Sequence, residues 1–385
     1  MRLSTDYKNM SPPLLHDHHT HPLLYAAFRQ AVDLSNVREL EEACDLINER
    51  RDRYDVVVAH SWKNNYFDFP AATLDSLPPC AIFNLSLHKV LINESGQAEL
   101  KNEFGSDVEK VADQDWFERN LRHVLNWFAL LGGSAAALTE FYQYLESVGV
   151  HSAEEMLLID GCEIDWFRDC GLLDRTRIWA APDTYERLSA EHKDIVAGFK
   201  FFTDGAFGSR TAAISQPYIG QPKNRGMLMY SDDELASNID RCAIGTKGIA
   251  IHAIGDVEIE QTIVAIENCR RRDAFKEIRI EDAQLISADQ ARRAKGLGII
   301  LSMQPNFNGD TLSYSDRLPP EFANANNPFR MLIDEQGFEP GVDLIFGSDG
   351  MPHGRKVATE QSFNPPLESQ RLSQQEFESG YSGKC

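Results

Sequence analysis

The sequence is poor in basic residues relative to acidic ones. Lys and Arg number 38 against 59 Asp and Glu, which gives a formal net charge of −21. Nucleic acids and anionic membrane surfaces are bound by clustered basic side chains, so this imbalance argues against both as partners. A small-molecule ligand fits the composition better, and it leaves homo-oligomerisation open.

Paired cysteines and long apolar runs are also absent. The seven cysteines are scattered and contain no C-x-x-C pair, which argues against a disulfide framework and favours a reducing cytoplasm. The first thirteen residues lack the apolar stretch of a signal peptide. The longest apolar stretch, Val124–Leu138, is too short to cross a membrane, and we expect a buried helix hairpin there. These features predict a cytoplasmic protein.

Eight short apolar runs are present, separated by stretches with helical spacing of apolar residues. The runs are 14–17, 150–159, 176–181, 195–203, 248–254, 278–286, 298–304 and 344–348. Near-continuous apolar strands alternating with helices indicate a parallel sheet covered on both faces. Eight such strands predict an α/β fold of the (β/α)₈ TIM-barrel type. A doubly wound open sheet is the alternative, although no G-x-G-x-x-G motif follows the first run.

The interval between the first two runs is too long for one connection and predicts an insertion. We expect a tail at 1–13, the first barrel strand at 14–21, an insertion subdomain over the strand ends at 22–140, the rest of the barrel at 141–355 and a C-terminal segment at 356–385. The insertion carries two further strand-like runs, 55–59 and 80–85, and helical segments at 37–53 and 113–131.

Four of the eleven histidines lie within six residues, at the end of the first run. Residues two apart on a strand point the same way, so His19 and His21 can reach one metal ion. A solvated histidine tract is the alternative. The tract follows Leu14 and Leu15 directly and is interrupted by Asp17 and Thr20, which favours a built site.

Lys200 lies among three phenylalanines, Phe199, Phe201 and Phe202. Burial disfavours the ammonium form of a lysine. A neutral amine can react with CO₂ to give a carbamate, an oxygen ligand able to bridge two cations. A lysine paired with Asp204 is the alternative interpretation.

Two more polar residues follow apolar runs. His252 ends the fifth run and Asp349 follows the eighth. Taken alone, His252 is as consistent with a satisfied core histidine, and Asp349 with a helix N-cap. Together with His19, His21 and Lys200, they lie at the carboxyl ends of separate strands, where active sites form in barrels.

These motifs resemble the amidohydrolase superfamily, and in particular its YtcJ-like branch of metal-dependent hydrolases (amidohydrolase family 3). The matching stretches are Asp17-x-His19-x-His21, 198–213, 251–256, Gln304-Pro305 and 347–349, with weaker similarity at Ser61-Trp62, His88 and Asn93. The resemblance covers nearly the whole chain.

Two departures from the family pattern stand out. Asp282 occupies the place of a metal-binding histidine after the sixth strand, where the family has Glu-His-Ala. A carboxylate is a harder ligand and favours another metal, or one ion in place of two. Few residues flank the barrel on either side, so the β-sandwich domain usual in the family is expected to be absent or vestigial.

The resemblance implies roles for individual residues. His19, His21 and Asp349 hold one divalent ion, expected to be Zn²⁺, and Lys200, carbamylated, bridges to a second ion held by His252, with Asp282 as a further candidate ligand. Asp349 accepts a proton from the attacking water and passes it to the leaving group. The candidate substrate contacts are His88, Arg210 and Gln304. A surface salt bridge for Arg210 and a structural hydrogen bond for His88 are the alternatives.

The resemblance therefore predicts a metal-dependent hydrolase of carbon–nitrogen bonds in non-peptide amides, ureas or cyclic amides. Two other functions stay open. A decarboxylase or isomerase of the same superfamily would use the same metal. A catalytically degenerate binding protein would have lost it, as the missing histidine at Asp282 could indicate.

Overall fold

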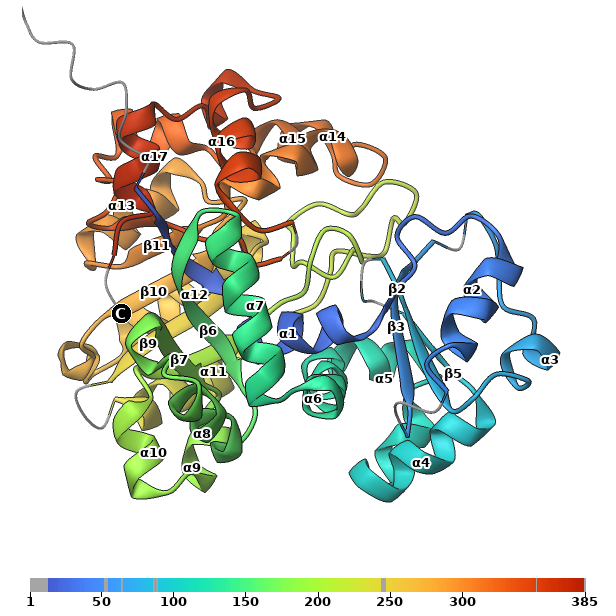
Figure 1. Cartoon of the computed structure of the whole chain (residues 1–385). Coiled ribbons are helices and arrows are strands. Elements are labelled where there is room, and N and C mark those ends of the chain that lie inside the picture. Colours follow the sequence, from blue (N-terminus) through green and yellow to red (C-terminus); the bar gives the residue numbers. More distant parts are fainter. Residues whose placement is uncertain are drawn as a thin grey trace, which may run out of the picture.

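The computed structural model describes residues 13–51, 55–63, 65–85, 87, 89–243, 247–350 and 352–383. All eight predicted runs form strands of one parallel sheet, in the order β1-β6-β7-β8-β9-β10-β11-β12. The strands are β1 (Leu15–Thr20), β6 (Val150–Leu158), β7 (Thr176–Ala180), β8 (Gly198–Phe202), β9 (Gly248–Ala253), β10 (Ile278–Asp282), β11 (Ile300–Met303) and β12 (Leu344–Phe346). The predicted TIM barrel is confirmed (Figure 1).

The sheet closes where the end of β12 meets the end of β1. The Ser348 backbone N–H donates to the His19 carbonyl at 3.1 Å. The Asp17 carboxylate accepts bonds from the Ser348 N–H at 2.9 Å and hydroxyl at 2.6 Å. Gly347 is needed at this approach, because a Cβ there would lie 2.4 Å from the His19 nitrogen. These contacts place the ends of the first and last strands side by side.

Helices connect the strands and cover the sheet. They are α7 (Ala135–Ser147), α8 (Gly161–Asp169), α9 (Pro182–Arg187), α10 (Ala190–Ile195), α11 (Asp232–Cys242), α12 (Asp256–Asn268), α13 (Ala288–Gly296), α14 (Asp310–Ser313), α15 (Pro320–Ala325), α16 (Arg355–Phe363) and α17 (Gln374–Gly380). Short 3₁₀ helices lie at η3 (Leu173–Arg175), η4 (Arg272–Ala274), η5 (Pro305–Gly309) and η7 (Glu368–Gln370), with a π-helix at η6 (Met331–Glu335). Ser231 and Ser287 begin α11 and α13 with capping boxes, which fixes where these helices start.

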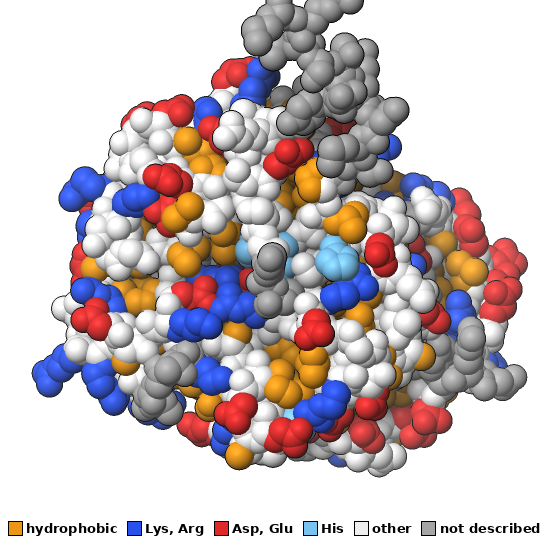
Figure 2. Space-filling view, turned by 60° about the vertical axis from the view of Figure 1, so that its left-hand side comes forward, with side chains coloured by type: hydrophobic (Ala, Val, Ile, Leu, Met, Phe, Trp, Pro, Cys, Tyr) orange, Lys and Arg blue, Asp and Glu red, His pale blue; other side chains and the backbone are white. Residues whose placement is uncertain are grey.

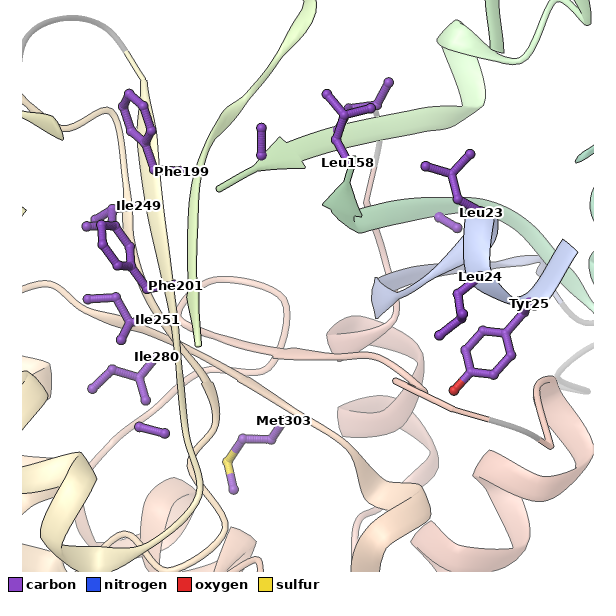
Figure 3. Close-up of a cluster of buried hydrophobic side chains, with 14 of the residues drawn as sticks. Leu23, Leu24, Tyr25, Leu158, Phe199, Phe201, Ile249, Ile251, Ile280 and Met303 are labelled. Atoms are coloured by element: carbon purple, nitrogen blue, oxygen red, sulfur yellow. The ribbon is translucent and has the colours of Figure 1, made fainter. Parts of the chain in front are cut away.

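Apolar side chains between the strands and the outer helices form the main core. Phe199, Phe201, Ile249, Ile251 and Ile280 are at most 3% exposed and project from β8, β9 and β10 (Figure 3). Burial of such side chains stabilises the fold by about 1.5–3 kcal/mol each. The strands are therefore held by packing on their outer faces, which leaves the barrel interior free to carry polar side chains.

The chain between β1 and β6 forms a second, four-stranded sheet beside the barrel (Figure 1). Its strands are β2 (Val32–Asp33), β3 (Val57–Trp62), β4 (Cys80–Asn84) and β5 (Val90–Ile92), and β5 alone runs antiparallel. Its helices are α1 (Pro22–Gln30), α2 (Leu40–Asn48), α3 (Ala71–Leu74), α4 (Glu94–Phe104), η2 (Ser106–Lys110), α5 (Gln114–Arg119) and α6 (Leu121–Gly132). The two strand-like runs expected here correspond to β3 and β4, whereas β2 and β5 were not expected.

The predicted helix hairpin at Val124–Leu138 is wrong in its geometry. Helices α6 and α7 meet at an angle of 101°, because the chain breaks between Gly132 and Ala135. In the described part of the chain no single helix has the length and apolarity needed to cross a membrane, and only this bent pair passes on combined length and composition. The six described cysteines form no disulfide.

Candidate metal centre and active site

A cavity of about 460 Å³ opens at the carboxyl ends of the barrel strands. Five of the residues expected to carry chemistry line it: His19, His21, Lys200, His252 and Asp349. They come from β1, β8, β9 and the segment after β12, so the fold brings together side chains that are far apart in the chain. This convergence is the arrangement that a shared catalytic site requires.

His19, His21 and Asp349 form the tightest group in the cavity. The His21 Nε2 lies 3.0 Å, and the His19 Nε2 3.5 Å, from the Asp349 Oδ1. One ligand atom from each residue lies within 4.8 Å of the other two. Two imidazole nitrogens and one carboxylate oxygen are the usual protein ligands of a catalytic zinc ion, with a fourth position left open. The three residues therefore fit a divalent metal.

His19 is oriented by two buried side chains behind it. Its Nδ1 lies 2.9 Å from the Glu281 Oε2 and 3.0 Å from the Gln304 Nε2. With Nδ1 engaged, Nε2 is the ring nitrogen turned to Asp349. Carboxylates that hold the far nitrogen of a metal-binding histidine fix its orientation and its tautomer. Glu281 was not predicted as a site residue, and only its place next to Asp282 could have indicated it.

Asp349 occupies a strained backbone position. Its φ is 56°, in the left-handed region that favours glycine, and its N–H donates to the His19 carbonyl at 2.6 Å. Burial raises the pKa of Asp349, but the hydrogen bond from His21 and the positive charges of His19, His21 and Lys200 outweigh it and lower the pKa. The side chain is 32% exposed and faces the cavity.

Lys200 is 1% exposed, and its Nζ has no hydrogen-bond partner among the described residues. It lies 5.0 Å from the centre of the Phe202 ring. A buried ammonium group without a partner is costly. The alternative pairing with Asp204 is not observed, since that carboxylate accepts bonds from the backbone of Ala213, Ile254 and Gly255.

His252 lies between two carboxylates. Its Nδ1 is 2.6 Å from the Asp282 Oδ2, and its Nε2 is 3.3 Å from the Asp204 Oδ1. Burial lowers the pKa of His252, but the charges of Asp282 and Asp204 overcome this and raise the pKa well above its ordinary value. Asp282, with φ of 73°, is therefore a partner of His252 as well as a candidate ligand. Asp204 was not predicted as a site residue.

The three predicted substrate contacts differ in their placement. His88 lies outside the described residues. Arg210 is absent from the cavity lining in the described part of the chain and reaches Asp316 at 4.0 Å. Gln304 is fully buried behind His19, where it can orient that ring. Contact of any of the three with a substrate stays a prediction.

A second group of possible ligands lies elsewhere on β1 and consists of His16, His18 and Glu154. The Glu154 Oε1 lies 3.4 Å from the His16 Nε2 and 3.1 Å from the His18 Nδ1. Arg279 donates to both oxygens of Glu154, at 2.9 and 3.1 Å. Burial would raise the pKa of Glu154, but Arg279 and the two histidines hold it well below its usual range. The guanidinium already supplies the positive charge that a metal would bring.

The contact between Glu154 and Arg279 also shows where this second group lies. Their strands, β6 and β10, are separated in the sheet by β7, β8 and β9, so the side chains meet across the barrel interior. Figure 2 shows one face of the molecule, on which histidine side chains reach the surface among Lys, Arg and acidic side chains. His18 also contacts the carbonyl of Ser382, at 2.9 Å.

Comparison with known proteins agrees with this fold. The model of the Amidohydrolase family matches residues 10–356. The putative amidohydrolase YtcJ of Bacillus subtilis (strain 168) is 33% identical over 165 residues, which make up 43% of this chain and 30% of YtcJ. The aligned segment therefore spans less than a third of that curated relative.

Two solved structures are similar along most of the chain. An uncharacterized metal-dependent hydrolase from Pyrococcus furiosus aligns with a TM-score of 0.71 at 21% identity, covering 96% of this chain and 80% of its own. Another from Pyrococcus horikoshii OT3 gives 0.70 at 20% identity, covering 96% and 77%. The resemblance to amidohydrolases inferred from the motifs is confirmed.

Proposed function

Because this chain belongs to the amidohydrolase family, we propose that it is a metal-dependent hydrolase that cleaves carbon–nitrogen bonds in non-peptide amides, ureas or cyclic amides. The observation that carries the proposal is the convergence of His19, His21 and Asp349, with ligand atoms within 4.8 Å of one another, in a 460 Å³ cavity. The cavity has room for a small molecule next to the metal ligands.

The metal is proposed to be Zn²⁺, held by His19, His21 and Asp349. Such a cation supplies Lewis-acid activation of water and of the substrate carbonyl group. Glu281 and Gln304 hold the His19 ring so that its Nε2 is presented to the cavity. Asp349 lines the same cavity, which supports its proposed role of accepting a proton and returning it to the leaving nitrogen.

Lys200 is proposed to react with CO₂. The neutral amine attacks the carbon, a carbamate forms on Nζ and one proton is released to solvent. The Lys200 Nζ is buried and has no hydrogen-bond partner among the described residues, which supports this reaction. The carbamate would replace this unpaired amine with two oxygens that can accept hydrogen bonds or bind a cation. Those oxygens, with His252 and Asp282, would form the ligand set for a second ion.

Two measurements on the purified protein test the proposed function. Elemental analysis should find about one or two equivalents of transition metal, and a panel of amides, ureas and cyclic amides should contain substrates. Asp349→Asn should retain most of the metal while turnover collapses. Full activity in that variant would contradict the proton-shuttle role, and a protein that binds no metal would contradict the hydrolase. Release of CO₂ from carboxylic acids, without hydrolysis of any panel member, would indicate a decarboxylase instead.

A further inference from the structure

The cavity has two ends that differ in exposure and in charge. At the inner end Lys200 and His19 are each 1% exposed. At the outer end the lining includes Arg119 and Arg122, at the end of α5 and the start of α6. Arg119 is exposed, and the Arg122 side chain is 36% exposed, so both guanidinium groups meet solvent where a ligand enters.

The carboxylates that line the cavity leave these arginines largely available. Asp204 is occupied by backbone N–H groups and Asp349 by the histidines. Asp183 alone approaches an arginine of the mouth, at 3.7 Å from Arg122, and it is itself 61% exposed. Within the described part of the chain Arg119 has no ion pair. An exposed pair at this distance contributes little, so a ligand can displace it.

Much of the remaining lining of the cavity is apolar. Leu121, Leu125, Phe202, Met229 and Tyr230 are among these side chains. A molecule that reaches from the metal ligands to the arginines must therefore present an apolar body to these walls. The position of two arginines is notable in a chain with a net charge of −21, whose overall field repels anions.

We propose that Arg119 and Arg122 bind a carboxylate of the substrate, which makes the preferred substrates amides in which an apolar body separates the scissile bond from a free acid group. The inference rests on the proposed hydrolase function. The planar guanidinium group pairs with carboxylates through two parallel hydrogen bonds, and a pair of arginines can grip one acid from two sides. Substrates that lack the acid should lose affinity at the mouth and keep their chemistry at the metal centre.

Two compounds that differ only in the carboxylate test the proposal. 4-(Acetamidomethyl)benzoic acid and N-benzylacetamide are compared by acetate release from the metal-loaded protein. We expect kcat/KM to be at least about tenfold higher for the acid, a difference that corresponds to one arginine–carboxylate contact. Arg119→Gln and Arg122→Gln should raise KM for the acid by a similar factor, leave kcat within about twofold, and leave the neutral amide unaffected.

Arg187→Gln is the matched control. Arg187 lies 3.7 Å from the same Asp183 carboxylate, but it does not line the cavity. Wild-type kinetics in this variant would show that the effect of Arg122 does not come from a lost pair with Asp183. Equal kcat/KM for the two compounds, or unchanged KM in both cavity variants, would overturn the proposal while the hydrolase function stands.

Binding separates failure of this proposal from failure of the proposed function. If the protein hydrolyses neither compound nor any other amide, the hydrolase proposal fails. Calorimetric titration with 4-(acetamidomethyl)benzoic acid then decides the arginine site by itself. Binding that weakens at least about tenfold in Arg119→Gln and Arg122→Gln supports it, and binding that is absent or the same in these variants and wild type contradicts it.

Discussion

Strand β1 and the residue after it carry two pairs of histidines that lie next to each other in the chain and have different surroundings. His19 and His21 meet Asp349 at the carboxyl ends of the barrel strands, whereas His16 and His18 meet Glu154 inside the barrel. The carboxylates decide the difference. Among the described residues the Asp349 carboxylate has close contacts with histidines, whereas the Glu154 carboxylate accepts hydrogen bonds from Arg279 on both oxygens. The same side-chain types therefore form a candidate metal centre in one place and a buried ion-pair network in the other.

Single substitutions in the two histidine pairs should give the largest difference in bound metal and in turnover. His19→Ala or His21→Ala should remove most of the bound metal and lower turnover by at least about a thousandfold, because metal activation of water is lost. His16→Ala and His18→Ala should keep the metal and most of the activity. Elemental analysis measures the bound metal of the four variants, and kinetics measures their turnover. Loss of metal from the His16 and His18 variants alone would show that the metal binds at the second group.

Removal of the Arg279 guanidinium group tests how much this residue stabilises the buried network of His16, His18, Glu154 and Arg279. Arg279→Met should lower the free energy of unfolding by about 3–5 kcal/mol, because it removes the guanidinium that donates to both oxygens of the buried Glu154 carboxylate and leaves the more distant Arg177, at 3.7 Å. Glu154→Gln combined with Arg279→Met should recover part of that loss. Denaturant unfolding gives the values.

Arg168→Met is a surface control for this comparison. Its side chain is 39% exposed and pairs with Asp165 and Glu191, so a loss of at most about 1 kcal/mol is expected. An Arg279→Met variant as stable as this control would show that the inner ion pair is dispensable.

A Glu→Gln substitution can be made next to each pair of histidines, at Glu281 and at Glu154. Glu281→Gln should weaken metal affinity about 10–100-fold, because Glu281 orients His19. Glu154→Gln should leave metal affinity within about twofold of wild type. Competition with a chromophoric chelator measures both. Equal effects of the two substitutions would show that the networks are not separate.

The smallest effect concerns Glu155, the neighbour of Glu154 on β6. It accepts bonds from the backbone of Leu23 and Leu157, and burial raises its pKa to about 8. The folded state therefore binds a proton at Glu155 more tightly than the unfolded state does. Proton binding adds to the free energy of unfolding in full below pH 4.5, and this contribution is lost as the pH rises to about 8.

Glu155→Gln provides the corresponding measurement. The stability of wild type relative to this variant should fall, on the order of 1 kcal/mol, between pH 7 and pH 8. Unfolding curves at several pH values measure the difference. A difference that is constant or that rises with pH would contradict the protonated, buried state of Glu155.

Much of the barrel could be predicted from the sequence, because its strands are near-continuous apolar runs buried on both faces. The stretches with helical spacing between the runs also contain helices, such as α11 between β8 and β9. The short strands β2 and β5 were missed, since two or three residues carry no periodicity. The 101° bend between α6 and α7 depends on packing and left no clear signal in the sequence.

The candidate site was predicted through residues that follow strands, and this signal cannot reveal partners across the barrel. Glu281 and Asp204 act through contacts with His19 and His252 that only the folded chain brings together. Alternation along a strand would place His18 and His19 on opposite faces. The register of β1 shifts between Asp17 and Thr20, and both rings meet interior side chains.

The most direct test of the account is a crystal of the zinc-loaded protein measured at the zinc absorption edge. The account predicts an anomalous peak among His19, His21 and Asp349, and none among His16, His18 and Glu154. A peak only at the second group, or no peak at either in protein that hydrolyses amides, would contradict it.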